Sequence, residues 1–261
     1  MPLAAKETKR APAFFVGHGN PMNAIENNAF TRSLRNLGKE IQRPKAVLVI
    51  SAHWTVPYTA ISLHQRDTLL YDMYGFPDAL YQITYPAPNA DFLVSDLQKL
   101  LPDLHVEERD LDHGVWSVLV HLFPDADIPV MQLSINTTFS MQEHFKLGRT
   151  IRRLREHGVM IIGSGNVTHN LRDMRALADA PVVPWAKEFD DFVKHAIIQK
   201  EYDALIHFEE RQRYAKHAHP TTEHYIPLLY IAGSAYEDDK SRSTYEKIEH
   251  GTLSMRNWLL T

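Results

Sequence analysis

The most constraining feature of this 261-residue chain is a set of short apolar runs, each followed within a few residues by a histidine. The pairs are residues 13–16 with His18, residues 46–50 with His53, and residues 159–162 with His169. A buried run of four or five such residues is typical of a central β-strand. Ligands of open α/β sheets bind beyond the carboxyl ends of the strands. Imidazole is a common metal ligand, so the pattern predicts a metal centre at one edge of a sheet.

Alternating strand and helix patterns define the expected fold. The strand-like segments lie near residues 13–16, 46–51, 59–64, 105–109, 128–135 and 159–163. Ser140 and Glu143 form a capping-box pattern that predicts a helix start, and Gly158 is placed to end that helix. Pro184 marks the start of another amphipathic helix. The alternation predicts an α/β fold with a mostly parallel or mixed central sheet covered by helices on both faces. No repeat or flexible linker divides residues 1–261, so we expect a single domain.

The composition limits the chemistry of a metal site in this chain. The chain has 15 histidines and no cysteine, so a metal must be held by nitrogen and oxygen atoms, and disulfides are excluded. The formal net charge of −4 provides no basic face, so we expect no nucleic-acid partner. No segment approaches the ~20 apolar residues that a membrane helix needs. We therefore expect no membrane partner and a cytoplasmic location.

Two further histidines lie in segments with possible chemical roles. His113 follows a strand-like segment and precedes a helix, so it could act as an acid or base, and Asp112 could orient a neighbouring group. Taken alone, an ordinary histidine beside a helix-capping aspartate is the more common arrangement. His224 stands beside Glu223 in a predicted helix that begins at a threonine, 221 or 222. Adjacent helical side chains point about 100° apart, so only one of the two should face a metal.

Two loops could shape a pocket around these groups. Residues 65–90 are rich in aromatic residues and proline, which suits either the wall of a pocket for a flat apolar ligand or a rigid surface loop. Residues 163–170 contain several small residues, but they match a phosphate-binding loop weakly because the P-loop lysine is absent. We expect the small residues to let the chain pass close to a metal or substrate, with His169 pointing inward.

Taken together, these segments resemble the LigB-type extradiol ring-cleaving dioxygenases, in particular the 4,5-DOPA extradiol dioxygenase branch. The matching stretches are residues 17–22, 51–54, 74–77, 85–88, 112–114, 165–171 and 219–229. They run in order over nearly the whole chain. Asn20 departs from the family pattern, which usually has a serine there. The wider superfamily uses a carboxylate as third metal ligand, whereas the DOPA-type branch uses the histidine, which here is His224 rather than Glu223.

The resemblance implies a reaction and a set of residue roles. The protein would open the ring of a catechol such as L-DOPA beside one hydroxyl, using O2, to give a semialdehyde. Non-haem Fe2+ would be held by His18, His53 and His224, with open positions for substrate and O2. His113 and His169 would move protons, one as the base toward the catechol and the other as the acid at ring opening. If Zn2+ occupies the site, His169 could be a fourth ligand.

Two other functions are compatible with the same histidines. A zinc hydrolase would use the centre to make a hydroxide nucleophile, and its activity would persist without O2. A non-enzymatic binding protein is the second, since the related Memo proteins share this fold, and it would turn over no catechol. The full set of five histidines favours an enzyme over the binding protein.

Overall fold

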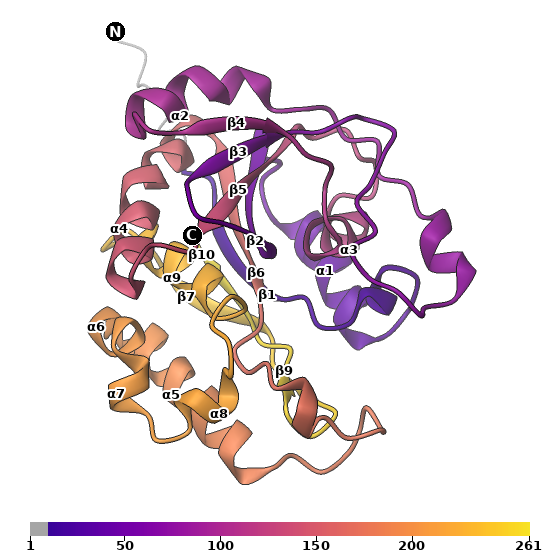
Figure 1. The fold of residues 1–261 in the computed structure, drawn as a ribbon, viewed down its shortest axis with the longest axis vertical. Helices are drawn as coiled ribbons and strands as arrows, with labels where there is room; N and C mark the ends of the chain where they lie inside the picture. Colours follow the sequence, from indigo (N-terminus) through magenta and orange to yellow (C-terminus); the bar gives the residue numbers. More distant parts are fainter. Residues whose placement is uncertain (1–9) are drawn as a thin grey trace, which may run out of the picture.

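A mixed sheet of eight strands forms the centre of the computed structural model, which describes residues 10–261 (Figure 1). The strands are β1 (Ala13–Gly17), β2 (Ala46–Val56), β3 (Ala60–Leu63), β4 (His105–Glu108), β5 (Val130–Asn136), β6 (Val159–Gly165), β7 (Ser241–Tyr245) and β10 (Asn257–Leu260). Their order is β4-β3-β5-β2-β6-β1-β10-β7. The four strands β5, β2, β6 and β1 are parallel, whereas β3 is antiparallel to β5 and β10 is antiparallel to β1 and β7. The short strands β8 (Ile248–Glu249) and β9 (Leu253–Ser254) form a separate antiparallel pair.

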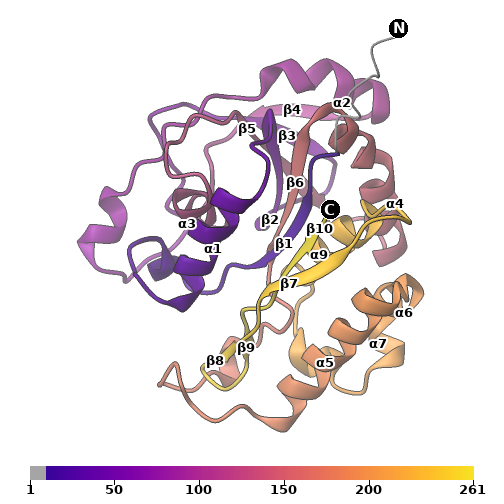
Figure 2. The same cartoon turned by 180° about the vertical axis from the view of Figure 1, so that it is seen from behind.

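Helices cover both faces of this sheet (Figures 1 and 2). Alternate residues of β1 point to opposite faces: Phe14 packs in one core with Leu34, and Phe15 packs in the other with Phe145. The helices are α1 (Ala29–Glu40), α2 (Val94–Leu100), α3 (His113–Leu122), α4 (Met141–Ile151), α5 (Pro184–Gln199), α6 (Tyr202–Ile206), α7 (Phe208–Arg211), α8 (Ala215–Ala218) and α9 (Ile226–Gly233). Helices α1 and α3 belong to the first core, and α4 and α9 belong to the second. The predicted α/β fold with helices on both faces is confirmed. Residues 1–9, which the single-domain prediction included, lie outside the described part of the chain.

The local helix signals act as predicted. Ser140 and Glu143 form both hydrogen bonds of a capping box at the start of α4. A 3-10 turn continues from α4, and Gly158 ends it with a φ of 86° in the left-handed region that glycine adopts without strain. Pro184 is the first residue of α5. Within residues 10–261, none of the helices combines the length and the apolar character that crossing a membrane requires.

Strand β2 extends further than its apolar run predicts. The run predicts an end at residue 51, but β2 continues to Val56, so His53 lies inside the strand and not beyond it. The pairing with β5 explains the difference. Ile50 is opposite Leu133 and Thr55 is opposite Ile135. The four residues 51–54 of β2 therefore lie opposite a single residue, 134, of β5. Such a bulge interrupts the ladder and re-aims side chains, which turns His53 away from the regular strand pattern.

Candidate metal centre

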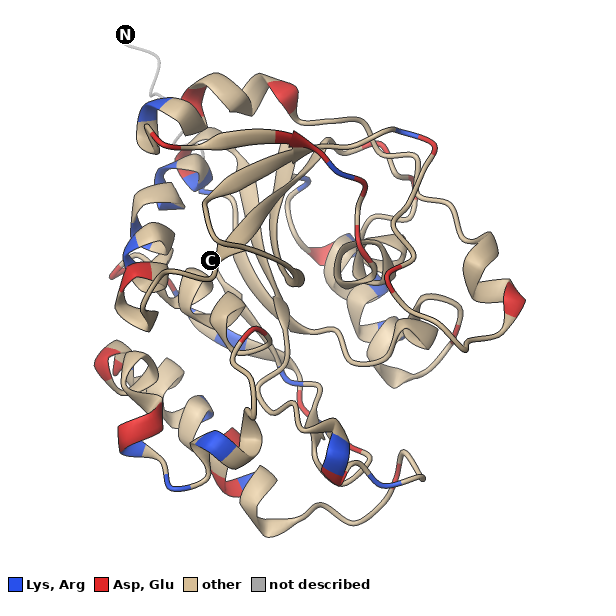
Figure 3. Cartoon of the chain, in the orientation of Figure 1, with Lys and Arg blue, Asp and Glu red and all other residues tan. Residues whose placement is uncertain are grey.

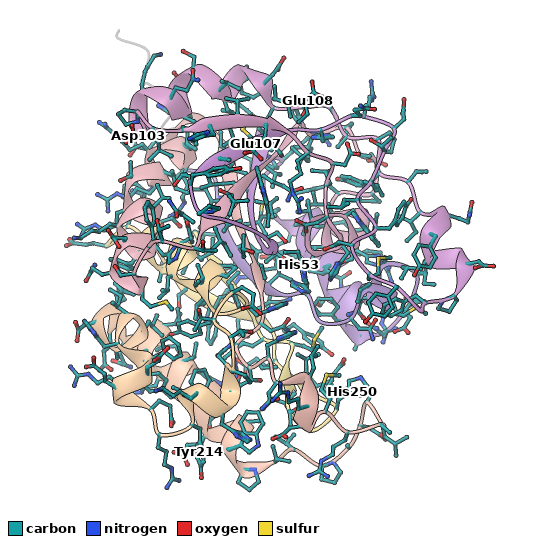
Figure 4. The ribbon with its side chains drawn as sticks, viewed as in Figure 1. His53, Asp103, Glu107, Glu108, Tyr214 and His250 are labelled. Atoms are coloured by element: carbon teal, nitrogen blue, oxygen red, sulfur yellow. The ribbon has the colours of Figure 1, made fainter. Side chains whose placement is uncertain are left out.

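Three of the predicted ligands meet at the ends of the central strands. His18 follows β1 directly, His53 lies in the bulge of β2, and His224 lies in the turn before α9. The ring centroids of His18 and His224 are 5.3 Å apart, and the centroid of His53 lies 5.0 Å from each of them. Each of the three offers a nitrogen within 4.8 Å of the others. Figure 4 shows His53 near the middle of the molecule, whereas Glu107 and Glu108 lie on the outer strand β4.

Glycines at the end of β6 allow the His224 turn to approach the sheet. A Cβ atom on Gly165 would lie 2.2 Å from the backbone oxygen of His224, which is much closer than atoms can approach. That same oxygen accepts a hydrogen bond of 2.9 Å from the backbone N–H of Asn166. The small residues of this segment therefore admit the backbone of residue 224. Their predicted closeness to a metal or substrate stays a prediction.

The prediction of a helix from residue 221 or 222 is wrong, because α9 begins only at Ile226. The backbone oxygen of Thr222 accepts from the N–H groups of Tyr225 and Ile226, which closes a turn before the helix. Glu223 and His224 lie in that turn, so the angular argument for a helix does not apply to them. Oε1 of Glu223 lies 3.3 Å from Nδ1 of His224, and both residues are near His169.

His169 lies against His224, on the side of Glu223. The two imidazole rings are parallel, with an angle of 4° between their planes and 3.5 Å between their centroids. His169 is held there by a hydrogen bond of 3.0 Å from its backbone N–H to the oxygen of Ala218. Together with Glu223 and His224 it forms a second group of potential ligand atoms.

His113 joins the cluster as the first residue of α3. Its ring centroid lies 3.9 Å from that of His53 and 5.6 Å from that of His18. Oδ1 of Asp72 accepts hydrogen bonds from both the backbone N–H and the Nδ1 of His113, at 3.0 and 2.8 Å. Burial raises the pKa of Asp72, but the hydrogen bonds and charge of His113 outweigh burial, and the pKa lies below its ordinary value.

The sequence reasoning did not single out Asp72, which comes from the aromatic loop at residues 65–90. Within that loop, Tyr71 packs against Trp116 with ring centroids 5.8 Å apart, and its hydroxyl donates to the oxygen of Ile83. Tyr74, in contrast, is 93% exposed. A lone carboxylate within the aromatic stretch 71–77 is the signal that could have identified Asp72. Whether the loop also walls a substrate pocket stays a prediction.

Ser164 determines which nitrogen of His18 is free. The hydroxyl of this buried serine donates to the oxygen of Gly114 at 2.6 Å, so it must accept at 2.9 Å from Nδ1 of His18. The proton of His18 is therefore on Nδ1, and its Nε2 presents a lone pair. This Nε2 lies 3.1 Å from Nε2 of His53, the separation expected for two imidazoles that share one ion at about 2.0–2.1 Å.

Asp112 orients Ser51, which in turn contacts His53, and it also binds Gln132. Its carboxylate accepts from the hydroxyl of Ser51 at 2.7 Å and from Nε2 of Gln132 at 2.8 Å. The Ser51 oxygen accepts in turn from the backbone N–H of His53 at 3.2 Å. Asp112 thus stabilises the bulge of β2 that carries His53.

The electrostatics of the cluster suit a divalent metal. Burial lowers the pKa of His53 to about 3 and that of His169 to about 4, and it holds the pKa values of His18 and His224 well below the ordinary 6.5. The positive charge that each neighbouring imidazole would carry lowers the pKa of His18 further. These side chains are therefore neutral at pH 7, which leaves nitrogen lone pairs for a metal. The residues present thus form a metal-binding group of histidines with carboxylates close by.

Buried histidines inside and outside the cluster have lowered pKa values, which predict that the metal-free protein loses stability in mild acid. Burial lowers the pKa values of His144, His169 and His219 to about 4 in the folded state, whereas unfolded histidines bind protons near pH 6.5. The unfolded state then holds more protons between about pH 6.5 and 4, so the free energy of unfolding should fall as the pH drops through this window, by about 1.4 kcal/mol per pH unit for each such histidine.

Urea unfolding with a chelator present, at pH 7, 6 and 5, measures this slope. Replacement of His144, which lies outside the cluster with its Nδ1 3.1 Å from the Tyr230 hydroxyl, supplies a control. His144→Gln should have a smaller slope than the wild type. Equal free energies of unfolding at pH 7 and pH 5 in the wild type would contradict the prediction.

The fold and the cluster define a class of protein, an α/β metalloprotein whose site is built from histidines at strand ends. The chain belongs to the LigB family. Residues 12–258 match this family, which is described as "Catalytic LigB subunit of aromatic ring-opening dioxygenase". The resemblance noted in the sequence is therefore confirmed.

Relatives of known name agree with this assignment. The chain is 40% identical to a 4,5-DOPA dioxygenase extradiol of Escherichia coli K12, over 94% of this chain and 93% of the relative. It is 35% identical to the enzyme of that name from Beta vulgaris, over 95% and 96% of the two chains. A solved structure of an uncharacterized Escherichia coli K12 protein matches with a TM-score of 0.85 and 37% identity, covering 97% of this chain and 100% of that one. These relatives support an extradiol ring-cleaving dioxygenase and favour neither the zinc hydrolase nor the non-enzymatic binding protein.

Proposed function

We propose that this protein uses Fe2+ and O2 to open the ring of a catechol of the L-DOPA type beside one hydroxyl, giving a semialdehyde. The observation that carries the proposal is the convergence of His18, His53 and His224 in a chain of the LigB family. The relatives named for DOPA support the substrate class. A cytoplasmic location, which we also propose, would keep the enzyme in a reducing compartment.

In this proposal His18, His53 and His224 hold the metal through neutral imidazole nitrogens. The bound metal would supply Lewis acidity toward the catechol oxygens and open positions for substrate and O2. Zn2+ fits the same nitrogen donors, so we expect it to compete for the site. In a zinc-loaded protein, His169 remains the candidate for a fourth ligand; its ring stacks parallel to that of His224 and would have to turn to share the ion.

Two histidines are proposed to move protons beside the metal. Asp72 accepts from Nδ1 of His113, so the other nitrogen, Nε2, is free to take a proton from the catechol. His169 would then be the acid at ring opening; because burial lowers its pKa to about 4, it would pass on a proton that it has first accepted during the reaction. A histidine suits each role because its unperturbed pKa lies near neutral pH and is easily moved by the surroundings.

A catechol screen tests the proposal. With Fe2+ and air, L-DOPA or a related catechol should give a yellow ring-opened product, with one O2 consumed for each ring opened. An oxygen electrode and absorbance scans on the same sample measure both quantities. Product formation under strict anaerobiosis would favour the zinc hydrolase, and absence of turnover with every catechol would favour the binding protein.

A further inference from the structure

Asp72 divides its two carboxylate oxygens between two histidines of the cluster. Oδ1 accepts both N–H groups of His113, and Oδ2 lies 3.6 Å from Nδ1 of His53. The Asp72 side chain is only 19% exposed. The central strands β1, β2, β5 and β6 contain no Asp, Glu, Lys or Arg, and such residues lie on the surrounding helices and loops and on the outer strand β4 (Figure 3). A carboxylate for His53 must therefore come from outside these strands, and the loop at residues 65–90 supplies it.

The contact to His113 fixes the proton of that ring. Two donors hold Oδ1, one from the backbone at 3.0 Å and one from Nδ1 at 2.8 Å. A carboxylate accepts and does not donate, so Nδ1 must carry the hydrogen. The Nε2 of His113 is then unprotonated in the neutral ring. The backbone contact also ties Asp72 to the first residue of α3, so the loop and the helix hold the ring in one orientation.

The contact to His53 biases that ring in the same sense. At 3.6 Å the contact between Oδ2 and Nδ1 is longer than a hydrogen bond, but the negative charge still favours a hydrogen on Nδ1. The opposite nitrogen of His53 is the one that faces Nε2 of His18. A metal-binding histidine usually donates its other N–H to a carboxylate or carbonyl, which orients the ring and makes the ligand more basic.

We propose that Asp72 is a positioning residue that sets the proton-bearing nitrogen of a metal ligand, His53, and of a proton carrier, His113, at the same time. The part that concerns proton transfer rests on the proposed function, whereas the part that concerns metal affinity does not. Asp72 thereby links the aromatic loop to the metal centre. A displacement of this loop would change metal affinity and proton transfer together.

The variant Asp72→Asn separates the two contacts. Its single amide oxygen should stay with the two N–H groups of His113, which places the amide nitrogen against Nδ1 of His53. That nitrogen donates, so it disfavours the His53 form that binds metal through Nε2. We expect the zinc affinity of the metal-free protein to fall about 10- to 100-fold, with the proton of His113 still on Nδ1. Asp72→Ala should lose both effects.

Zinc titration against a chromophoric chelator measures the affinity, and long-range ¹H–¹⁵N NMR spectra of the histidines report which nitrogen carries each proton. Asp110→Asn is the matched control, since Asp110 accepts from the backbone N–H of Gln65 at the start of the same loop and an amide oxygen can replace it. Thermal unfolding checks that each variant is folded. Wild-type zinc affinity in folded Asp72→Asn, or an unchanged His113 proton in folded Asp72→Ala, would overturn the proposal. Neither readout needs a catechol, so a protein that passes both but opens no ring contradicts the proposed function alone.

Discussion

His18→Ala, His53→Ala and His224→Ala should each abolish binding of the divalent metal and, with it, ring opening. The three nitrogens lie within 4.8 Å of one another, and an open site with three protein ligands cannot spare one of them. Purified wild-type protein should hold about one divalent ion per chain. Elemental analysis of the wild type and of each variant measures this directly.

Two variants serve as controls for the ligand assignment. His195→Ala, at an exposed position of α5, should keep its metal, and so should Glu223→Gln, because we assign the third ligand to His224. Full occupancy in His53→Ala would refute the three-histidine site. Loss of metal in Glu223→Gln with retention in His224→Ala would show that the carboxylate is the ligand.

His113→Phe should retain its metal but lose about 10²- to 10⁴-fold in turnover rate, the usual effect of removing a general acid or base. Phenylalanine fills a similar volume beside the His53 ring, which lies 3.9 Å away between centroids, but it carries no nitrogen that can accept a proton. His169→Phe should lose rate to a similar extent. If His169 is also a zinc ligand, that variant should bind zinc more weakly as well.

Rate, metal content and melting temperature measured on both variants separate these cases. Metal content and melting temperature serve as the controls for each variant. A loss of rate indicates a role in proton transfer only where the variant keeps its metal and its fold. Turnover of His113→Phe at the wild-type rate would leave His113 as an ordinary histidine at a helix start.

The strands that the sequence predicts include the central ones, which have an apolar run, and also β3 and β4, whose signals are shorter. Strands β1, β2 and β6 are buried on both faces along their apolar runs at residues 13–16, 46–50 and 159–162, and these runs mark the sheet. Strand β5 is buried as well, although Gln132 and Ser134 interrupt its apolar residues. The C-terminal strands β7 and β10 carry weaker signals, with polar residues in the first and only four residues in the second. The place of β10 beside β1, and of β7 beside β10, depends on pairing between distant parts of the chain, which no local pattern encodes.

The site divides in a similar way. His18, His53, His113 and His169 can be selected because they follow predicted strand ends, whereas His224 is chosen over Glu223 through the family resemblance. The structure joins all five in one connected cluster. The bulge at His53 and the turn at Glu223 depend on tertiary hydrogen bonds, so the lengths of β2 and α9 are mispredicted. Asp72 contacts His113, 41 positions away, and Ser164 contacts His18, 146 positions away, and such long-range contacts leave no periodic trace.

The fate of molecular oxygen tests the central claim most directly. Protein loaded with Fe2+ is supplied with ¹⁸O₂ and L-DOPA, or with the best catechol of the screen, and the product is analysed by mass spectrometry. Extradiol ring opening predicts that the semialdehyde product gains both labelled atoms, and that the His18→Ala variant forms no labelled product. A ring-opened product that carries no label, so that its new oxygen comes from water, or one that forms without O₂, would contradict the assignment.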